Sequence, residues 1–272
     1  MTDDSTPAAA SPPPRRWMSD PRVGVAALAV SVVALGLAAA PWFGGMDGRV
    51  RAYLLSHPEL LEEMVQARQA HEDNQRVETI NAAVAANPGL LAPDPRDPAF
   101  GPVDAKVTVI EFFDFRCPGC KAVTPDFLRL MRAHPEVRFV FKDWPILDRQ
   151  GQPLSQLAAR AALAAHQQGK YLPVYEALLR EPALDEAAIQ RVLAANGVDL
   201  SRAETTITAP ETTRHLTDIH TTAAALGLVG TPTFFINGKT TATIDPAEVG
   251  RMIEAAKSAP ADAPHRTAVP AA

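Results

Sequence analysis

The stretch Asp114-Phe115-Arg116-Cys117-Pro118-Gly119-Cys120 contains the only two cysteines among the 272 residues of the chain. Residues 107–113, directly before it, are mostly apolar and rich in β-branched and aromatic side chains, which predicts a strand buried on both faces. Residues 121–132, directly after it, repeat apolar side chains at helical spacing. The sequence therefore predicts a strand, a tight turn and a helix that begins at the two cysteines.

The start of a helix is a favourable place for a negative charge, because aligned peptide dipoles and unpaired amide groups point there. We expect this position to stabilise the thiolate of Cys117 and to lower its pKa below the ordinary value of about 8.5. Cys120 lies one turn further on and can attack a mixed disulfide at Cys117. Pro118 fits the first helical turn, where it removes no needed donor. The pair is therefore predicted to alternate between dithiol and disulfide.

Other kinds of site with two nearby cysteines require partners that this sequence does not supply. Covalent haem attachment needs a histidine after the second cysteine, where Lys121 stands. A zinc site of four cysteines is excluded, and none of the seven histidines has ligand spacing toward the pair. We therefore expect no cofactor and no resident metal. Capture of copper(I) by the two thiolates, or a holdase role without redox turnover, stays open as an alternative.

The rest of the sheet is predicted from two distant segments. Residues 137–141 form a second strand, and its spacing after the first implies a right-handed parallel crossover. Residues 233–236 and 239–244 form a hairpin around the type I′ turn Asn237-Gly238. Thr231-Pro232 precedes this hairpin, where proline suits a turn, often with a cis bond. The pattern is that of an α/β fold with a thioredoxin-like sheet.

Helical patterns occupy the chain between the two halves of the sheet and after it. They cover residues 155–168, 171–179, 185–196, 211–226 and 246–257. The first four predict a helical insertion domain over about 143–230 that caps the sheet. The folded domain as a whole is expected over 100–257, and the Ala- and Pro-rich residues 258–272 are expected to form a disordered tail.

The amino-terminal part predicts a membrane anchor. Residues 1–22 are poor in large apolar side chains and are interpreted as a disordered cytoplasmic tail. Residues 23–43 carry no charge and would span roughly 31 Å as a transmembrane helix. Arginines precede this run and Asp47 follows it, so the positive-inside rule exports the following domain. We expect a single-pass protein of the bacterial inner membrane with its catalytic domain in the periplasm; a cleaved signal peptide is the rival interpretation.

A polar helical stalk is predicted over residues 48–90. Ser56 and Glu59 have the spacing of a capping box, and Pro58 predicts a break in the helix. The apolar stripe of this stalk is thin, which leaves three interpretations. The stalk docks on its own domain, pairs with copies of itself as a homo-oligomerisation segment, or serves as a solvated spacer. The net charge of −5 argues against nucleic acid as a partner.

These features together resemble the DsbA group of disulfide oxidoreductases over about residues 103–257. The resemblance rests on Glu111 six residues before Cys117, the Cys-Pro-Gly-Cys turn, the helical insertion and Gly230-Thr231-Pro232. Three further segments are similar to the ScsC-like branch of that group: Tyr53-Leu54-Leu55-Ser56-His57-Pro58-Glu59, Lys142-Asp143-Trp144-Pro145-Ile146-Leu147 and Gly169-Lys170-Tyr171.

The resemblance implies a role for each of five residues. Cys117 would be the attacking thiol, Cys120 the resolving thiol and Pro232 the cis-proline beside them. Thr231 would offer its backbone to an extended substrate, and such strand-like hydrogen bonds make specificity loose. Glu111 would be a buried acid that accepts or returns the proton of Cys120; a solvated carboxylate at the strand end is the alternative.

The resemblance also implies a function: formation or isomerisation of disulfide bonds in exported proteins, with a membrane or periplasmic redox partner that recharges the cysteines. The best-known oxidase of the group has histidine where Gly119 stands, so a milder oxidant is expected here. Arg116 and Lys121 flank the pair and are expected to restore part of the thiolate stabilisation. An oligomeric stalk would favour isomerisation over one-way oxidation.

Overall fold

The computed structural model describes residues 21–40, 46–148 and 152–259. It divides into two compact units, Met1–Gln69 and Ala70–Ala272. Almost all of the two predicted disordered tails, 1–22 and 258–272, lies outside the described residues. The segment 70–99, which precedes the expected start of the folded domain, belongs to the second compact unit.

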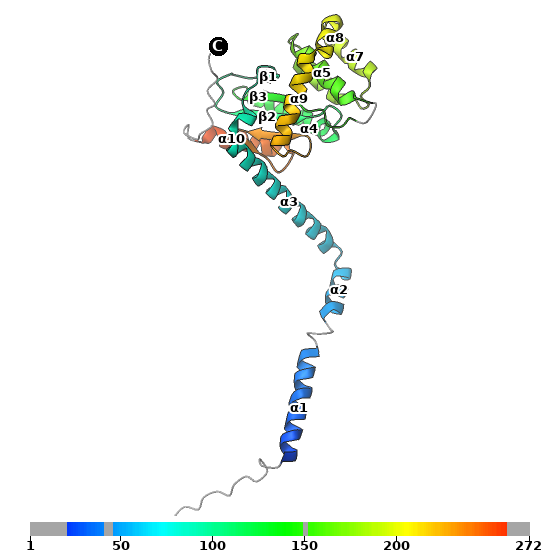
Figure 1. Ribbon diagram of the computed structural model, residues 1–272, viewed down its shortest axis with the longest axis vertical. Helices are drawn as coiled ribbons and strands as arrows, with labels where there is room; N and C mark the ends of the chain where they lie inside the picture. Colours follow the sequence, from blue (N-terminus) through cyan, green and yellow to red (C-terminus); the bar gives the residue numbers. More distant parts are fainter. Residues whose placement is uncertain (1–20, 41–45, 149–151, 260–272) are drawn as a thin grey trace, which may run out of the picture. The chain divides into compact units, whose positions relative to one another are not determined.

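The first unit contains helices α1 (Pro21–Ala40), α2 (Met46–Ser56) and the beginning of α3 (Glu59–Ala86), all drawn in Figure 1. The described side chains of α1 are exposed. Among the helices in the described ranges, none combines the length and the apolar character that crossing a membrane requires. The predicted anchor 23–43 extends past the last described residue of α1, so its end lies outside the described residues.

The break predicted near Pro58 is confirmed, since α2 ends at Ser56 and α3 begins at Glu59. The hydroxyl of Ser56 donates to the carbonyl oxygen of Tyr53 at 2.9 Å. This hydroxyl therefore closes the preceding helix instead of capping the next one, because its donor is directed back into α2.

The second unit is built on a five-stranded sheet in the order β1-β3-β2-β4-β5. The strands are β1 (Ala99–Phe100), β2 (Thr108–Phe113), β3 (Arg138–Asp143), β4 (Thr233–Ile236) and β5 (Lys239–Thr240). β2 and β3 are parallel, as predicted, and β4 runs antiparallel to β2. Asn237 and Gly238 have φ angles of 46° and 81°, as a type I′ turn requires. The hairpin is confirmed, although β5 is shorter than expected.

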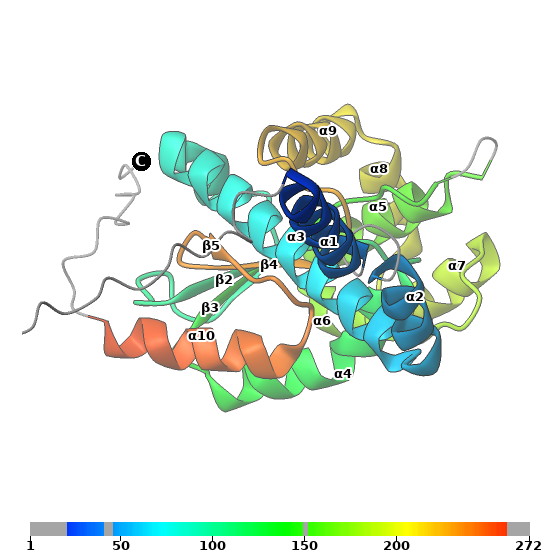
Figure 2. The same cartoon turned by 90° about the horizontal axis from the view of Figure 1, so that it is seen from below.

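Helices cover both faces of the sheet. Figure 2 shows α4 (Pro118–Ala133) and α10 (Pro246–Ser258) on one side of the strands, with α9 (Pro210–Ala225) and the second half of α3 on the other. Alternation along β2 explains the two layers: Val109 and Phe113 join the cluster with α4 and α10, whereas Ile110 and Phe112 join the cluster with α3 and α9. The α/β thioredoxin-like fold with a helical insertion is therefore confirmed.

The insertion contains α5 (Leu154–His166), α6 (Tyr171–Arg180), α7 (Glu186–Ala195) and α8 (Leu200–Thr208), and continues into α9. Four of these five match the predicted helical segments. The sequence did not predict α8, because its threonines have low helix propensity. The helix forms because the Asp199 carboxylate accepts hydrogen bonds from the amides of Ser201 and Arg202, and because Ala203 and Thr206 are buried.

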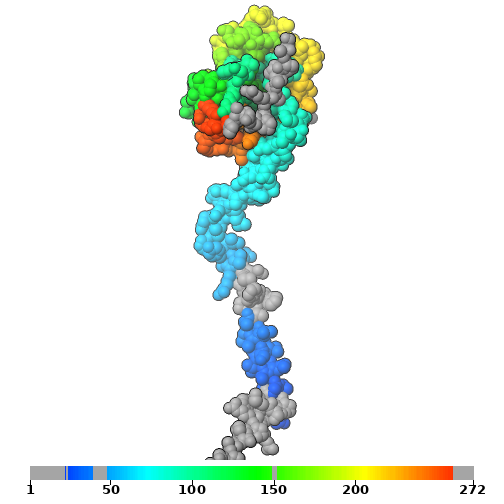
Figure 3. Space-filling model, turned by 90° about the vertical axis from the view of Figure 1, so that its left-hand side faces the viewer, coloured from blue at the N-terminus to red at the C-terminus, as the bar shows by residue number. Residues whose placement is uncertain are grey.

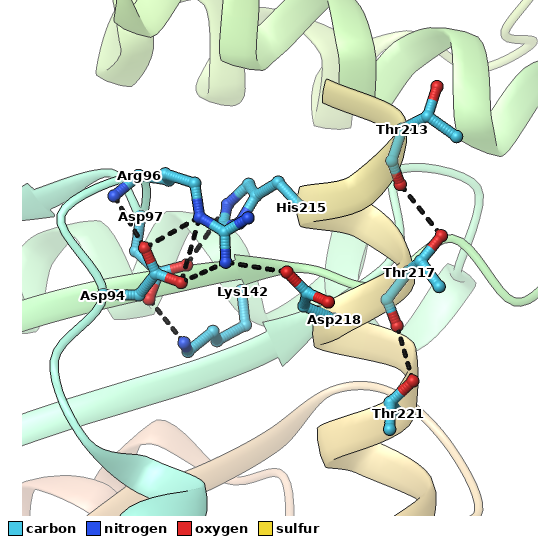
Figure 4. A network of polar contacts seen from close by, with 9 residues as sticks. All are labelled: Asp94, Arg96, Asp97, Lys142, Thr213, His215, Thr217, Asp218 and Thr221. Atoms are coloured by element: carbon cyan, nitrogen blue, oxygen red, sulfur yellow. Dashed lines mark hydrogen bonds and ion pairs between the residues drawn. The ribbon is translucent and has the colours of Figure 1, made fainter. Parts of the chain in front are cut away.

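A buried charged network fixes the segment between α3 and β1 to the sheet (Figure 4). Asp97 and Lys142 form an ion pair whose side chains are 1% and 8% exposed. His215 on α9 places its Nε2 atom 3.3 Å from a carboxylate oxygen of Asp97. Burial raises the pKa of Asp97 to about 6 and lowers the pKa of His215 to about 4. At pH 7 a carboxylate therefore faces the Lys142 ammonium beside a neutral imidazole.

Arg96 extends the network to the exposed side of α9. Its guanidinium lies 2.6 Å from the carboxylate of Asp94 and 2.9 Å from that of Asp218. The hydrogen bond from Arg96 lowers the pKa of Asp94 to about 2. The residues between α3 and β1 are thus docked on the domain by charge pairs.

Removing the buried carboxylate should destabilise the fold strongly. We expect Asp97→Asn to lower the free energy of unfolding by about 3 kcal/mol at pH 7, because it leaves the Lys142 ammonium buried without its counter-charge. Denaturant unfolding followed by circular dichroism measures this loss. Glu211→Gln, which removes an ion pair with Arg214 on the surface, serves as the control and should leave the midpoint unchanged. Equal midpoints for the two variants would contradict the expected role of the Asp97–Lys142 pair.

Candidate active site

The two cysteines open α4, as the sequence predicts. Cys117 is the N-cap residue with an extended backbone, and Pro118 occupies the first turn without displacing a hydrogen bond. Both cysteines are free thiols. Cys117 is 7% exposed and Cys120 is fully buried, so only the first sulfur can meet a substrate.

Local hydrogen bonds hold the Cys117 thiol at a low pKa of about 5. The largest contribution comes from the Cys120 side chain, followed by Thr231 and the backbone amides of Cys120 and Gly119, while burial acts in the opposite direction. In the thiol form, the Cys117 Sγ atom also donates to the Thr231 carbonyl oxygen at 3.1 Å. The amides at the helix start favour the anion, as expected from the sequence, so Cys117 is a thiolate at neutral pH.

Cys120 holds its proton far more strongly than Cys117. Burial raises the pKa of the Cys120 thiol, and its hydrogen bond to Cys117 and the nearby Glu111 charge raise it further. The two thiols, one turn apart, therefore have opposite protonation states at neutral pH. This asymmetry assigns nucleophilic attack to the sulfur that is also the more accessible.

Glu111 lies on β2 and is completely buried. Its Oε2 atom accepts a hydrogen bond of 2.9 Å from the Tyr175 hydroxyl, while Oε1 has no partner among the described residues. Burial raises the pKa of Glu111 to about 8, and the charge of Cys117 contributes in the same direction. The alternative of a solvated strand-end carboxylate is therefore wrong, and this carboxyl group titrates near neutral pH.

A second buried carboxyl group repeats this arrangement on β3. The Tyr171 hydroxyl donates to Asp143 Oδ2 at 2.9 Å, and Tyr171 precedes Tyr175 by one turn of α6. Burial raises the pKa of Asp143 as well. Sequence reasoning missed Tyr175 as a partner of Glu111, because an aromatic residue in the apolar pattern of a helix is normally core.

Thr231 and Pro232 lie beside the motif, joined by a cis peptide bond. The Thr231 carbonyl contacts the Cys117 sulfur, and Pro232 faces the turn of the motif. A Cβ atom placed on Gly119 would lie 3.3 Å from Pro232 Cδ and 3.7 Å from Cys117 Sγ. The fold thus brings together all five residues that the sequence singled out.

The cations flanking the motif are directed elsewhere. Arg116 donates to the Leu147 carbonyl oxygen at 2.9 Å, and Lys121 donates to the Glu181 carbonyl oxygen at 2.6 Å. The largest contributions to the low pKa of Cys117 come instead from hydrogen bonds within the motif and from Thr231. The expectation that Arg116 and Lys121 restore thiolate stabilisation is not supported.

Asp114 holds the loop in front of Cys117 in place, which sequence reasoning also missed. Its buried carboxylate accepts hydrogen bonds from the amides of Arg116, Ile146 and Leu147 and from the Ser155 hydroxyl, at 2.7–2.9 Å. Its carbonyl oxygen accepts from the amide of Cys117 at 3.0 Å. Its position in the sequence could have indicated this role, because an acid directly after a buried strand and before a helix start often accepts hydrogen bonds that hold the turn.

The described part of the chain contains no group of three or more histidine, cysteine or acidic side chains placed to hold a metal ion. The two thiols together with Glu111, Thr231 and Pro232 form a site suited to thiol-disulfide exchange, since a stabilised thiolate, a protonated second thiol and a titratable carboxyl group lie side by side.

Two family models match the chain. One described as thioredoxin covers residues 94–255, and one described as the copper resistance protein ScsC N-terminal domain covers residues 46–75. Among curated proteins, the Na(+)/H(+) antiporter NhaA 3 of Salinispora tropica is 34% identical over 153 residues, which is 55% of this chain. That match covers only 23% of the antiporter's own length.

Solved structures share the fold. A thioredoxin-like oxidoreductase from Silicibacter pomeroyi is 34% identical, with a TM-score of 0.56, over 61% of this chain and 95% of that one. The thiol-disulfide exchange protein alpha-DsbA2 from Wolbachia pipientis is 22% identical, with a TM-score of 0.60, over 66% and 97%. A periplasmic thioredoxin-like protein from Salmonella enterica is 23% identical, with a TM-score of 0.51, over 62% and 95%. Taken with the geometry around Cys117, these matches mean that the chain is a thioredoxin-like oxidoreductase and belongs to the thioredoxin family whose model covers residues 94–255, with a match to the ScsC N-terminal domain over residues 46–75.

Proposed function

We propose that this protein exchanges disulfide bonds with exported proteins, and forms or isomerises them through Cys117 and Cys120. The observation that carries the proposal is the unequal proton affinity of the two thiols, a pKa of about 5 at Cys117 against a raised pKa at Cys120. The Cys117 thiolate attacks a substrate disulfide, and one substrate sulfur leaves as a thiolate. The product of this step is a mixed disulfide between substrate and Cys117.

Cys120 completes the exchange after it loses its proton. Glu111 is the group placed to accept that proton, because it is buried near the pair and titrates near neutral pH. Formation of the mixed disulfide removes the negative charge of Cys117, which is one cause of the high pKa of Glu111. The carboxyl group therefore ionises more readily at the step that needs a base. The Cys120 thiolate then attacks Cys117 and releases the second substrate thiolate; oxidation of a substrate is the same sequence reversed.

The site of action is proposed to be the periplasm, with residues 23–43 as the anchor in the inner membrane. The support is the charge-free run and the arginines before it, together with the exposed apolar side chains of α1. A redox partner on the same side of the membrane would recharge the cysteine pair. Recovery of the protein in the soluble fraction after alkaline extraction of membranes would rule out the anchor.

The N-terminal domain is proposed to assemble copies of the chain. Large apolar side chains of α2 and α3 are exposed in the first unit, among them Leu55, Leu61, Met64 and Val65 at 49–72% exposure. Leu61, Met64 and Val65 recur at three- and four-residue spacing, so they share one face of α3. A polar helix with such a face is stabilised when it packs against another copy.

The proposed reaction depends on the Cys117 sulfur. We expect the protein to catalyse insulin reduction by dithiothreitol and reactivation of scrambled ribonuclease, and Cys117→Ser to abolish both activities. The single-turnover rate with a small disulfide should rise as pH increases through about 5, because the Cys117 thiolate forms above that pH. Full turnover by the Cys117→Ser variant would overturn the proposed function.

Loss of the proton acceptor should slow the second step selectively. We expect Glu111→Gln to lower the rate at which Cys120 resolves the mixed disulfide roughly 100-fold, while the first attack by Cys117 stays unchanged. Rapid acid quenching followed by mass spectrometry measures the lifetime of the mixed disulfide. Asp143→Asn is a matched control, since Asp143 is also buried and paired with a tyrosine. An equal change in both variants would show that a structural effect, not proton transfer, is responsible.

The proposed oligomer should depend on the apolar face of α3. We expect Leu61→Lys combined with Met64→Lys to convert the full chain to a monomer, because two charges cannot be buried at a helix pairing surface. Analytical ultracentrifugation of the chain in detergent measures the mass. Gln66→Lys adds a charge at an exposed position off this face and should leave the mass unchanged. A monomeric unaltered chain would contradict the proposal.

A further inference from the structure

A groove of about 220 Å³ lies next to the redox centre, within the second compact unit. One wall consists of the loop 228–233, which contains Thr231 and Pro232, and of residues 240–244 after β4. The opposite wall consists of α3 residues Asp73, Arg76, Val77 and Ile80. The helix that leads from the N-terminal domain is therefore one side of a hollow that the cis-proline loop completes.

The α3 wall is fixed to the sheet. Ile80 and Val84 are buried in the cluster with β2, β4 and α9. The Asn81 side-chain oxygen accepts a hydrogen bond of 2.9 Å from the Thr240 amide on the edge strand β5. Figure 3 shows the turquoise atoms of this part of α3 next to orange atoms from the segment that follows β4. The groove is thus built from elements that fold together, and its width is set by packing.

Residues that line the groove also contact the redox motif. Thr231, which lines it, has its carbonyl oxygen 3.1 Å from Cys117 Sγ. Ile244, on the same wall, approaches the motif so closely that a Cβ atom on Gly119 would lie 3.5 Å from its Cδ1 atom. These contacts place the groove next to the sulfur to which a substrate cysteine would be joined.

The lining is suited to a polypeptide segment. Val229 and Ile244 expose apolar surface, at 74% and 41%. Thr240 is buried at 4% exposure, and its hydroxyl has no hydrogen-bond partner among the described residues. A buried hydroxyl without a partner is unfavourable, so a ligand in the groove that hydrogen-bonds to it gains binding energy. The Asp73–Arg76 ion pair, with N and O atoms 2.8 Å apart, forms a polar rim.

We propose that this groove binds the substrate segment next to the cysteine that Cys117 attacks, with α3 as a specificity-determining wall. The occupant is an extended polypeptide, because the volume holds one or two side chains and not a folded surface. An aliphatic side chain fits the apolar lining, and a backbone or hydroxyl group pairs with Thr240. This inference rests on the proposed function and adds to it that residues 70–86 recognise the substrate directly.

Filling the groove should slow only the reaction with peptides. We expect Val77→Trp and Ala242→Trp to lower the rate of attack on a disulfide-bonded peptide about tenfold, and to change the rate with hydroxyethyl disulfide less than about twofold. Glu78→Trp adds the same bulk to α3 at an exposed position outside the groove and should change neither rate. Stopped-flow mixing of the reduced protein with each disulfide measures these rates.

The possible outcomes separate this inference from the proposed function. If the unaltered protein reacts with neither disulfide, the proposed function fails. If it reacts with both and Ala242→Trp leaves the peptide rate unchanged, only the groove proposal is overturned; Ala242 is exposed, so this variant stays interpretable even if Val77→Trp fails to fold. An equal loss of rate with both disulfides would place the effect on the sulfur itself and would also overturn the proposal.

Discussion

The hydrogen bond between the Cys120 thiol and the Cys117 sulfur is the interaction on which the rest of the site depends. It makes the largest contribution to the low pKa of Cys117, and it also raises the pKa of Cys120. One contact therefore stabilises an anion at the accessible sulfur and a proton at the buried one. The start of α4 supports this state through its amides, and Pro118 occupies the first turn without competing for them.

The sheet supplies the second constraint, because it places a carboxyl group where water cannot reach. Alternation along β2 turns Val109, Glu111 and Phe113 to the face covered by α4 and α6. Burial raises the pKa of an acid at this position, because the charged carboxylate is unfavourable away from water. Tyr175 donates to one carboxylate oxygen, and the other has no partner within the described part of the chain. The charge on Cys117 adds to the effect of burial on the pKa of this group.

Much of this arrangement was predictable because it is local in sequence. The helix start at Cys117, the type I′ turn at Asn237-Gly238 and the parallel crossover all follow from short patterns, and each is present. The cluster of Thr231 with Cys117 was expected only through a resemblance, since 114 positions separate the two residues. Tyr175 and the Asp97–Lys142 pair were not predictable, because each joins residues whose neighbours carry no distinguishing pattern. For Asp114 the sequence offered one signal, its position between a buried strand and a helix start, but not the distant amides that it binds. The expectation that Arg116 and Lys121 stabilise the thiolate is not supported for a related reason. Their closeness to Cys117 in sequence did not determine which groups their long side chains bind, and both donate to distant carbonyl oxygens.

The hydrogen bond between Asn81 and the amide of Thr240 affects which fragments of the chain keep the sheet edge covered. β5 is the edge of the sheet, and α3 covers it by taking up one of its exposed donors. A fragment trimmed to begin near residue 100, where prolines make the chain look like a spacer, would lose that cover and uncover the apolar surface beneath Ile80 and Val84. Such a fragment would present an open strand to its neighbours and tend to self-associate, whereas one that begins at residue 70 keeps the edge protected.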